Sequence, residues 1–219
     1  MTSLDSTIVC TVLDRLYAEA ERTDGQILPR VRAEAARLGG RLDDPTVTDL
    51  LSEAFIPVAR EVGRLLYVLV RSCRPALAVE FGTSFGLSAI HIAAALRDNG
   101  GGRLICTELN PAKATRAAAH LREARLHDLV EIRQGDAFNT LSDLSGIGFL
   151  LLDGWKGLYL PMLKQLEPAL AVGSLIVADD VKLMPEVLAP YVAYVRDPVN
   201  GYVSAEVPID DGLELSARA

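Results

Sequence analysis

Short apolar runs alternate with helical stretches through the chain from Ala76 onward. The runs are ALAVEF, RLICTEL, LVEIRQGD, GFLLLD and SLIVADD, and each is typical of a strand buried on both faces. Each run is followed by Gly, Asn, Pro or Asp, and in most cases then by a helical pattern. This alternation predicts a parallel sheet built from βαβ units.

The last residues, NGYVSAEVPIDDGLELSAR (200–218), follow a different pattern. They leave no room for a crossover helix, and Asp211-Gly212 is a hairpin signal, so we expect two antiparallel strands that close the sheet. The predicted fold class is α/β: a mostly parallel sheet with an antiparallel last strand and helices on both faces.

Before Ala76 the pattern is helical. Apolar residues recur at helical spacing, which favours amphipathic helices that end at the Gly39-Gly40 pair. A turn at residues 43–45 should precede two more helices, TVTDLLSEAF and PVAREVGRLLYVLVRSC, the second with Pro57 near its first turn. We expect one domain over residues 1–219, made of N-terminal helices (1–75) and an α/β core (76–219).

The composition restricts the class of partner. The chain has 219 residues, half of them apolar, a net charge of −7 and a pI near 5.0. This acidity argues against a broad nucleic-acid surface, so a small-molecule partner fits more easily. No segment approaches the roughly 20 apolar residues of a membrane span. Cys10, Cys73 and Cys106 lack metal-like or redox-like spacing, so we expect reduced, mostly buried thiols in a cytoplasmic protein.

Ligands of open α/β sheets bind beyond the carboxyl ends of the strands, so the residues there carry the candidate chemistry. After the first strand, EFGTSFGLS places Gly82 and Gly86 where the backbone can turn tightly and approach a ligand, and the helix that begins near Ser88 presents free N–H groups. The spacing is G-x-x-x-G, not the G-x-G-x-x-G of dinucleotide sites. Taken alone, such a turn is common.

Two further strand ends carry acids. Glu108 follows the glycine turn by about one βα unit, where a carboxylate can accept both hydroxyls of a ribose. Asp136, followed by Ala137, could accept from an exocyclic adenine amine. Glu108 alone is as well explained as a solvated strand-end acid. Together with the glycine turn, however, the two acids indicate a nucleoside site.

These motifs carry a family resemblance. VEFGTSFGLSA, CTELNP and RQGDAF resemble the nucleoside-binding half of the class I methyltransferases that use S-adenosylmethionine (SAM). FLLLDGWKGLYLP and LIVADDV are similar to motifs of the cation-dependent O-methyltransferases of the catechol and caffeoyl-CoA type, and EVPIDDGLELS resembles their terminal hairpin. The resemblance covers about residues 50–219. It implies a Rossmann-like, seven-stranded sheet with the last strand reversed, extra N-terminal helices, SAM as the cofactor and a homodimer.

The resemblance also implies cofactor contacts, including the backbone around Val58 and the hydroxyl of Ser88. Trp155 would pack beside the adenine or form a wall of the substrate slot; the alternative is plain core packing. The full set of residues expected to contact SAM is Val58, Glu80, Gly82, Ser84, Ser88, Glu108, Asp136, Ala137, Asp153 and Trp155.

Methyl transfer from a sulfonium to oxygen chiefly requires a deprotonated oxygen in line with the methyl group. A divalent cation favours that ionisation as a Lewis acid and orients two vicinal oxygens by chelating both. Asp153, Asp179 and Asp180 supply hard carboxylate ligands from adjacent strand ends, which suits Mg²⁺, or another divalent cation such as Mn²⁺ or Ca²⁺. No histidine or cysteine cluster competes, so zinc is disfavoured.

Lys156 stands three residues after Asp153, within reach of the same oxygens. Near a cation and partly desolvated, its ammonium would be disfavoured, so Lys156 could act as the general base. The alternative is a surface lysine at the start of a helix. Gly154 replaces a bulkier residue of the animal catechol enzymes, which predicts a more open slot. The acid that those enzymes place against the second hydroxyl is absent, since Ala205 falls closest to its position.

The leading hypothesis is therefore a SAM- and Mg²⁺-dependent O-methyltransferase acting on a small, catechol-like molecule with vicinal hydroxyls. A second hypothesis keeps the cofactor and the metal but makes the acceptor a hydroxylated nucleoside in tRNA, which the acidic charge disfavours. A third is a nucleoside-binding module without catalysis, against which the retained acids and lysine argue.

Overall fold

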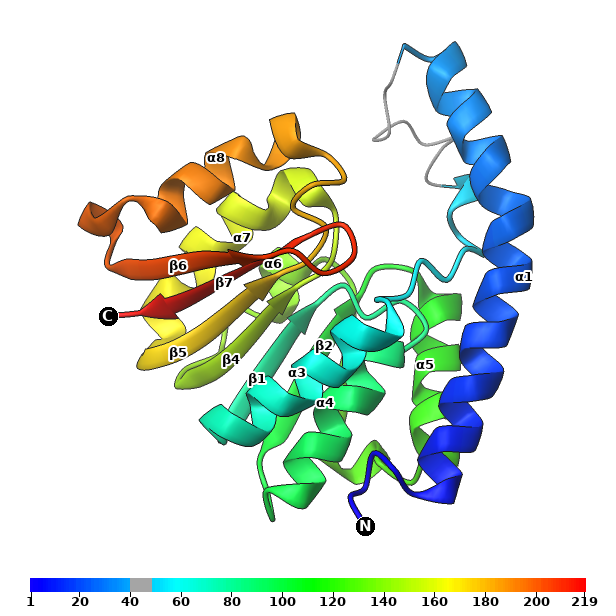
Figure 1. Cartoon of the computed structure of the whole chain (residues 1–219), viewed down its shortest axis with the longest axis horizontal. Helices are drawn as coiled ribbons and strands as arrows, with labels where there is room; N and C mark the ends of the chain where they lie inside the picture. Colours follow the sequence, from blue (N-terminus) through cyan, green and yellow to red (C-terminus); the bar gives the residue numbers. More distant parts are fainter. Residues whose placement is uncertain (40–48) are drawn as a thin grey trace.

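One seven-stranded sheet forms the centre of the molecule, in a computed structural model that describes residues 1–39 and 49–219 (Figure 1). The strand order is β3-β2-β1-β4-β5-β7-β6. Only β7 runs against its neighbours β5 and β6, so the predicted α/β fold with a reversed last strand is confirmed. The strands are β1 (Leu77–Phe81), β2 (Arg103–Glu108), β3 (Val130–Gln134), β4 (Ile147–Leu152), β5 (Leu170–Ala178), β6 (Tyr202–Val207) and β7 (Leu213–Arg218).

Helices cover both faces of the sheet (Figure 1). α3 and α4 pack with α1 over one face, and α6, α7 and α8 cover the other. The α-helices are α1 (Thr7–Arg37), α3 (Arg60–Cys73), α4 (Leu87–Asp98), α5 (Pro111–Glu123), α6 (Ala137–Thr140), α7 (Tyr159–Leu166) and α8 (Pro185–Arg196). Short 3₁₀ turns are η1 (His127–Leu129), η2 (Lys156–Leu158), η3 (Glu167–Ala169) and η4 (Pro198–Asn200).

Alternate strand residues feed two apolar cores. In β1, Ala78 packs on the α3–α4 side, whereas Val79 packs on the α7–α8 side, and both are fully buried. This two-sided burial explains why the central strands read as continuous apolar runs. The third run is an exception: β3 lies at the sheet edge and is only half-buried, because it has a strand neighbour on one side alone.

The N-terminal region differs from the predicted set of helices. Residues 7–37 form one continuous 31-residue helix, α1, which starts where the Ser6 hydroxyl accepts from the N–H of Val9. α3 begins at Arg60, so Pro57 lies before the helix and not in its first turn. The predicted turn at 43–45 and the start of the predicted helix at 46–55 lie outside the described residues, and Ala54 and Phe55 are not helical.

The thiols and histidines are placed as structural groups. Of the cysteines, only Cys106 is buried, so the expectation of mostly buried thiols is wrong: Cys73 is exposed and Cys10 is half-buried. His91 and His120 are buried, and each bonds a backbone carbonyl through Nδ1. Among the described residues, no helix combines the length and apolar character needed to cross a membrane.

Candidate active site

Three carboxylates converge at the carboxyl ends of β4 and β5. The backbone ladder continues one residue past these strands, because Asp153 N–H donates to Phe81 O and Asp179 N–H donates to Leu152 O, both at 3.0 Å. Asp153 and Asp179 are thereby set side by side. Asp180 adopts a left-handed φ of 61°, and its N–H bonds Asp179 Oδ1 at 2.9 Å. One oxygen from each of the three acids lies within 4.8 Å of the others.

Crowding and burial perturb two of these acids, Asp153 and Asp179. Burial, followed by the negative charge of its neighbours, raises the pKa of Asp153 well above the usual range, although Lys156 opposes the shift. Burial and then the charge of Asp180 raise the pKa of Asp179 to about 7. Such a group of carboxylates, one buried and two half-buried, is costly unless a positive charge neutralises it.

The ammonium of Lys156 supplies positive charge to this cluster. Its Nζ lies 2.8 Å from Asp180 Oδ2 and 3.5 Å from Asp153 Oδ1. Burial alone would lower the pKa of Lys156, but Tyr159, Asp153 and Asp180 outweigh it and raise the pKa well above the usual range. This direction is opposite to the one expected from desolvation near a cation. The alternative of a surface lysine is ruled out, because the side chain of Lys156 is only 13% exposed.

Tyr159 is a member of the site that sequence reasoning missed. It is fully buried, its Oη accepts from Lys156 Nζ at 2.8 Å, and it donates to the backbone oxygen of Asp179 at 3.2 Å. The phenol therefore links the lysine to the acidic cluster. Its position three residues after Lys156, at the start of α7, is the only sequence signal for it.

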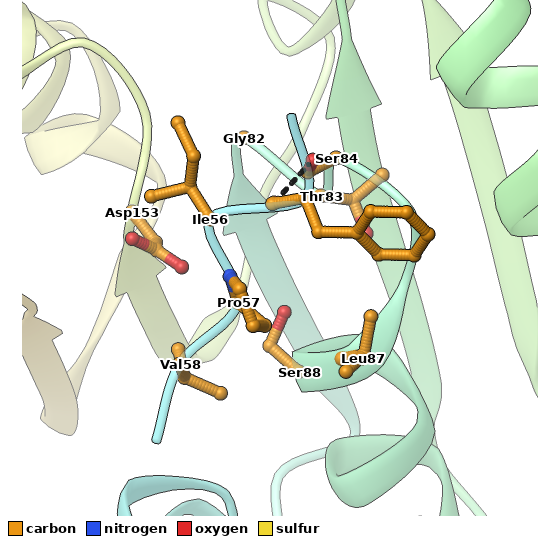
Figure 2. Close-up of a pocket in the computed structure, with 10 residues that line it drawn as sticks. Ile56, Pro57, Val58, Gly82, Thr83, Ser84, Leu87, Ser88 and Asp153 are labelled. Carbon is orange, nitrogen blue, oxygen red and sulfur yellow. Dashed lines mark hydrogen bonds between the residues drawn. The ribbon is translucent and has the colours of Figure 1, made fainter. Parts of the chain in front are cut away.

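A cleft beside the acidic cluster collects half of the residues expected to bind SAM. Of that set, Val58, Gly82, Ser84, Ser88 and Asp153 line it, together with five residues not predicted (Figure 2). Because Asp153 lines the cleft and also belongs to the acidic cluster, the two sites adjoin. The unpredicted lining residues are Phe55, Ile56, Pro57, Thr83 and Leu87.

Glu80 and Glu108 lie around this cleft without lining it. Glu108 accepts from the N–H of Ser84 at 2.9 Å and from the N–H of Asn110 at 2.8 Å, which fixes its carboxylate against the glycine turn. Glu80 is fully buried and accepts from the Ser88 hydroxyl. Burial raises the pKa of Glu80, while the nearby hydroxyls oppose this. Within the described residues, Glu80 Oε2 and Thr83 Oγ1 are buried without a hydrogen-bond partner.

The remaining predicted contacts lie outside the cleft. Asp136 is exposed, and its Oδ1 accepts from the N–H of Phe138, so the carboxylate caps α6. Ala137 is buried in the first turn of that helix. Trp155 is 41% exposed just after Asp153, which excludes plain core packing for its indole.

Two glycines allow the loops after β1 and β4 to touch. At Gly82, where φ is 91°, a Cβ would come 2.6 Å from Gly154 Cα. The prediction that Gly154 leaves the slot more open is wrong. A Cβ there would lie 2.6 Å from Cε1 of Phe81, so the phenyl ring already fills that space.

Comparisons with known proteins show which family the chain resembles. A family model described as a methyltransferase domain matches residues 79–181. The catechol O-methyltransferase of Niastella koreensis is 33% identical over 168 residues, which cover 72% of this chain and 75% of that protein. A probable O-methyltransferase of Mycobacterium tuberculosis is 35% identical over 191 residues, 79% of each chain.

A solved structure supports the fold. The O-methyltransferase TomG of Streptomyces achromogenes, in complex with SAM, superposes with a TM-score of 0.69 at 22% identity and covers 75% of this chain and 82% of that one. The sheet topology, the cleft beyond the glycine turn and the related sequences agree with one another. The chain therefore belongs to the class I, SAM-dependent O-methyltransferases of the catechol and caffeoyl-CoA O-methyltransferase family.

Proposed function

We propose that the protein transfers the methyl group of SAM to one hydroxyl of a small, catechol-like acceptor with vicinal hydroxyls, with a divalent cation bound by Asp153, Asp179 and Asp180. The observation that carries this proposal is the convergence of these three carboxylates within 4.8 Å, next to Lys156 and at the edge of the cleft. A nucleoside site alone would not need them. This favours an enzyme over a binding module.

The residues fit a hard cation. All three candidate ligands are carboxylates, which Mg²⁺, Mn²⁺ and Ca²⁺ prefer, and the described residues bring no histidine or cysteine into the cluster. The Lys156 ammonium is a positive charge already drawn to the same oxygens, so the position favours cations. When bound, the divalent cation would supply Lewis-acid activation of the acceptor hydroxyls.

Each residue then has a defined task. Lys156 Nζ would take the proton of the attacking hydroxyl, which requires a neutral amine. The same carboxylates that now stabilise its ammonium must therefore be engaged elsewhere during the reaction. Tyr159 would keep Nζ in place. Glu108, fixed against the glycine turn, would accept the ribose hydroxyls, and Asp136 with Ala137 would lie at the adenine.

Replacing Asp179 with Asn tests the metal site. Asp179 does not line the cleft, so the substitution should leave SAM affinity within about threefold while lowering methylation of a test catechol by at least about a hundredfold. Titration of Mg²⁺ by calorimetry should show weakened binding in the same variant. Activity would be measured with labelled SAM, with and without EDTA.

The matched control is Asp211→Asn, an exposed acid in the hairpin whose backbone oxygen contacts the Asp180 loop. It removes the same charge nearby without touching the cluster, so activity should stay near that of the unmodified protein. Methylation that survives both EDTA and Asp179→Asn would refute the metal site. Methylation of tRNA but of no small acceptor would refute the proposed substrate class.

A further inference from the structure

Residues 54–58, here called the strap, belong to no helix or strand, and residues 55–58 of it form one wall of the cleft. Figure 2 shows Ile56, Pro57 and Val58 crossing the opening between Asp153 and Ser88. Backbone polar groups outside regular structure need partners from elsewhere when they are buried. The identity of those partners shows what holds this wall in place.

Asp24 of α1 bonds two successive strap N–H groups. Its Oδ1 accepts from Phe55 at 2.7 Å and its Oδ2 accepts from Ile56 at 2.8 Å. The side chain is buried, with only 8% of the residue exposed. A buried carboxylate is expensive unless it is fully hydrogen-bonded, so these two charge-assisted bonds couple α1 strongly to the strap.

Side chains from three other parts of the fold bond three of the strap carbonyls. Lys113 Nζ donates to Ala54 O at 2.8 Å, Ser84 Oγ donates to Phe55 O at 2.9 Å, and Tyr17 Oη donates to Val58 O at 3.1 Å. The ring of Phe55 stacks on that of Phe85, 4.1 Å between centroids. The strap is therefore held between α1 on one side and the glycine turn and α5 on the other.

Ile56 is the strained point of the strap. Its φ is 44°, a left-handed conformation that is rare for a β-branched residue, and its side chain is 45% exposed at the cleft. Such a conformation persists only where its surroundings impose it. The bond from its N–H to Asp24 supplies that constraint.

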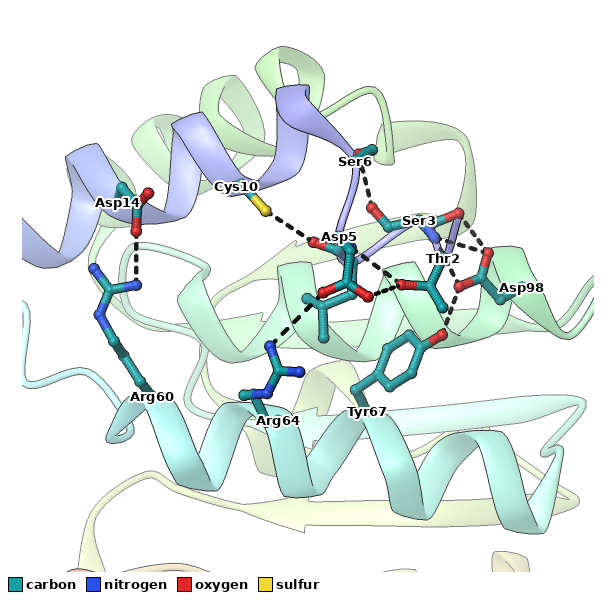
Figure 3. Close-up of polar contacts among 11 residues, drawn as sticks. Thr2, Ser3, Asp5, Ser6, Cys10, Asp14, Arg60, Arg64, Tyr67 and Asp98 are labelled. Atoms are coloured by element: carbon teal, nitrogen blue, oxygen red, sulfur yellow. Dashed lines mark hydrogen bonds and ion pairs between the residues drawn. The ribbon is translucent and has the colours of Figure 1, made fainter.

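α1 is in turn fixed to the core, so Asp24 and Tyr17 have defined positions. Just before α1 begins, the carboxylate of Asp98 on α4 accepts from the N–H of Ser3 at 2.8 Å and from the Ser3 hydroxyl at 2.6 Å (Figure 3). The same carboxylate accepts from Tyr67 Oη at 2.6 Å. Arg60 at the start of α3 bonds Asp14 at 2.8 Å. α1 thus acts as a rigid support for the strap.

We propose that Asp24, assisted by Tyr17, is a positioning residue for the cofactor: it holds the strap in the conformation that closes the SAM cleft. The inference rests on the proposed placement of SAM between the strap and the glycine turn. It gives the N-terminal helix a role in cofactor affinity, although no residue of α1 lines the cleft. A protein whose competent conformation is only partly populated binds its ligand more weakly by that fraction.

The test measures S-adenosylhomocysteine binding by calorimetry and backbone hydrogen exchange of the strap in the full chain. Asp24→Asn should raise the dissociation constant about tenfold, and Tyr17→Phe, which removes one neutral bond, about threefold. Both variants should speed exchange in a peptide that covers residues 54–58 while leaving α4 protected. In methylation assays, KM for SAM should rise with kcat nearly unchanged. Glu21→Gln, an exposed acid on the same helix, is the control.

Unchanged affinity in folded Asp24→Asn would overturn the inference. If that variant does not fold, Tyr17→Phe decides in the same way, because it leaves every buried charge in place. Glu108→Ala separates this result from failure of the proposed site. If binding is weaker in Glu108→Ala but unchanged in Asp24→Asn, only the role of the strap is refuted. Unchanged binding in Glu108→Ala refutes the cofactor placement as well.

Discussion

At the residue scale, the charge of Lys156 depends on its partners. Asp180, Asp153 and the Tyr159 hydroxyl surround Nζ at 2.8, 3.5 and 2.8 Å, and together they hold the proton against the effect of burial. A lysine in this setting is a base only when those carboxylates attract another cation more strongly. In the proposed mechanism, cation binding and the base strength of Lys156 are thus two properties of one cluster.

Tyr159→Phe should separate positioning of Lys156 from binding of the cation. It removes one hydrogen bond to Nζ and one to Asp179 O, so we expect kcat to fall about tenfold, with SAM affinity unchanged and the free energy of unfolding lower by about 1 kcal/mol. Steady-state kinetics over a range of pH would measure kcat, and urea denaturation would measure the free energy of unfolding. A shift in the pH profile would mark an effect on the base that mere destabilisation does not produce.

The matched control for Tyr159→Phe is Tyr194→Phe. Tyr194 on α8 also donates its hydroxyl once, to Glu167 Oε1 at 2.9 Å, but it has no contact with the acidic cluster. Its loss should change stability by a similar amount or less and leave kcat alone. An equal fall of kcat in both variants would show that Tyr159 acts only through stability.

At the element scale, the site exists because two loops approach closely. The turn after β1 and the turn after β4 meet at Gly82 and Gly154, which places Asp153 next to the glycine turn. A Cβ at Gly82 would collide with the backbone of Gly154, and a Cβ at Gly154 would collide with the ring of Phe81. The cleft and the acidic cluster are therefore joined through backbone packing as well as through Asp153.

Gly82→Ala should disrupt this junction, and Gly100→Ala provides the comparison. Both glycines have a positive φ, 91° and 82°, but only at Gly82 would a Cβ meet backbone atoms, at 2.6 Å. We expect Gly100→Ala to lower the free energy of unfolding by about 1 kcal/mol and Gly82→Ala by about 3 kcal/mol or more, with SAM binding lost only in the latter. Urea denaturation and calorimetry would measure these changes. Equal losses in the two variants would refute the close approach.

Local patterns predict the strands and the acids at their ends, since burial of β4 and β5 on both faces makes FLLLD and LIVADD continuous apolar runs ending in charge. They do not predict the contacts that complete the site. Asp24 meets Phe55 across 31 residues, and the side chain of Phe81 beside Gly154 depends on the strand order. Such pairings follow from tertiary packing and have no periodicity in the sequence.

At the scale of the whole molecule, a buried histidine and a buried carboxylate change the stability in opposite directions as pH falls. Burial, with a contribution from Arg64 and Arg60, lowers the pKa of His91 to about 4, although its bond to Leu87 O resists this. As pH falls below about 6.5, His91 becomes protonated in the unfolded chain but stays neutral in the folded one. The free energy of unfolding therefore decreases as pH falls from about 6.5 to about 4. Asp179, with its pKa raised to about 7, contributes the opposite slope in the same window.

The pH dependence of the whole protein's stability therefore hides the contribution of His91, and a variant at this position is needed to isolate that contribution. In His91→Asn the amide can still donate to Leu87 O but does not titrate, so the stability advantage of the unmodified protein should shrink by about 2 kcal/mol between about pH 7.5 and about pH 5. Urea denaturation at both pH values measures the difference. The exposed His127→Asn serves as control and should keep the original pH dependence. A pH-independent difference between His91→Asn and the unmodified protein would mean that His91 protonates while the chain stays folded, and that the α1–α3–α4 core admits water to its ring.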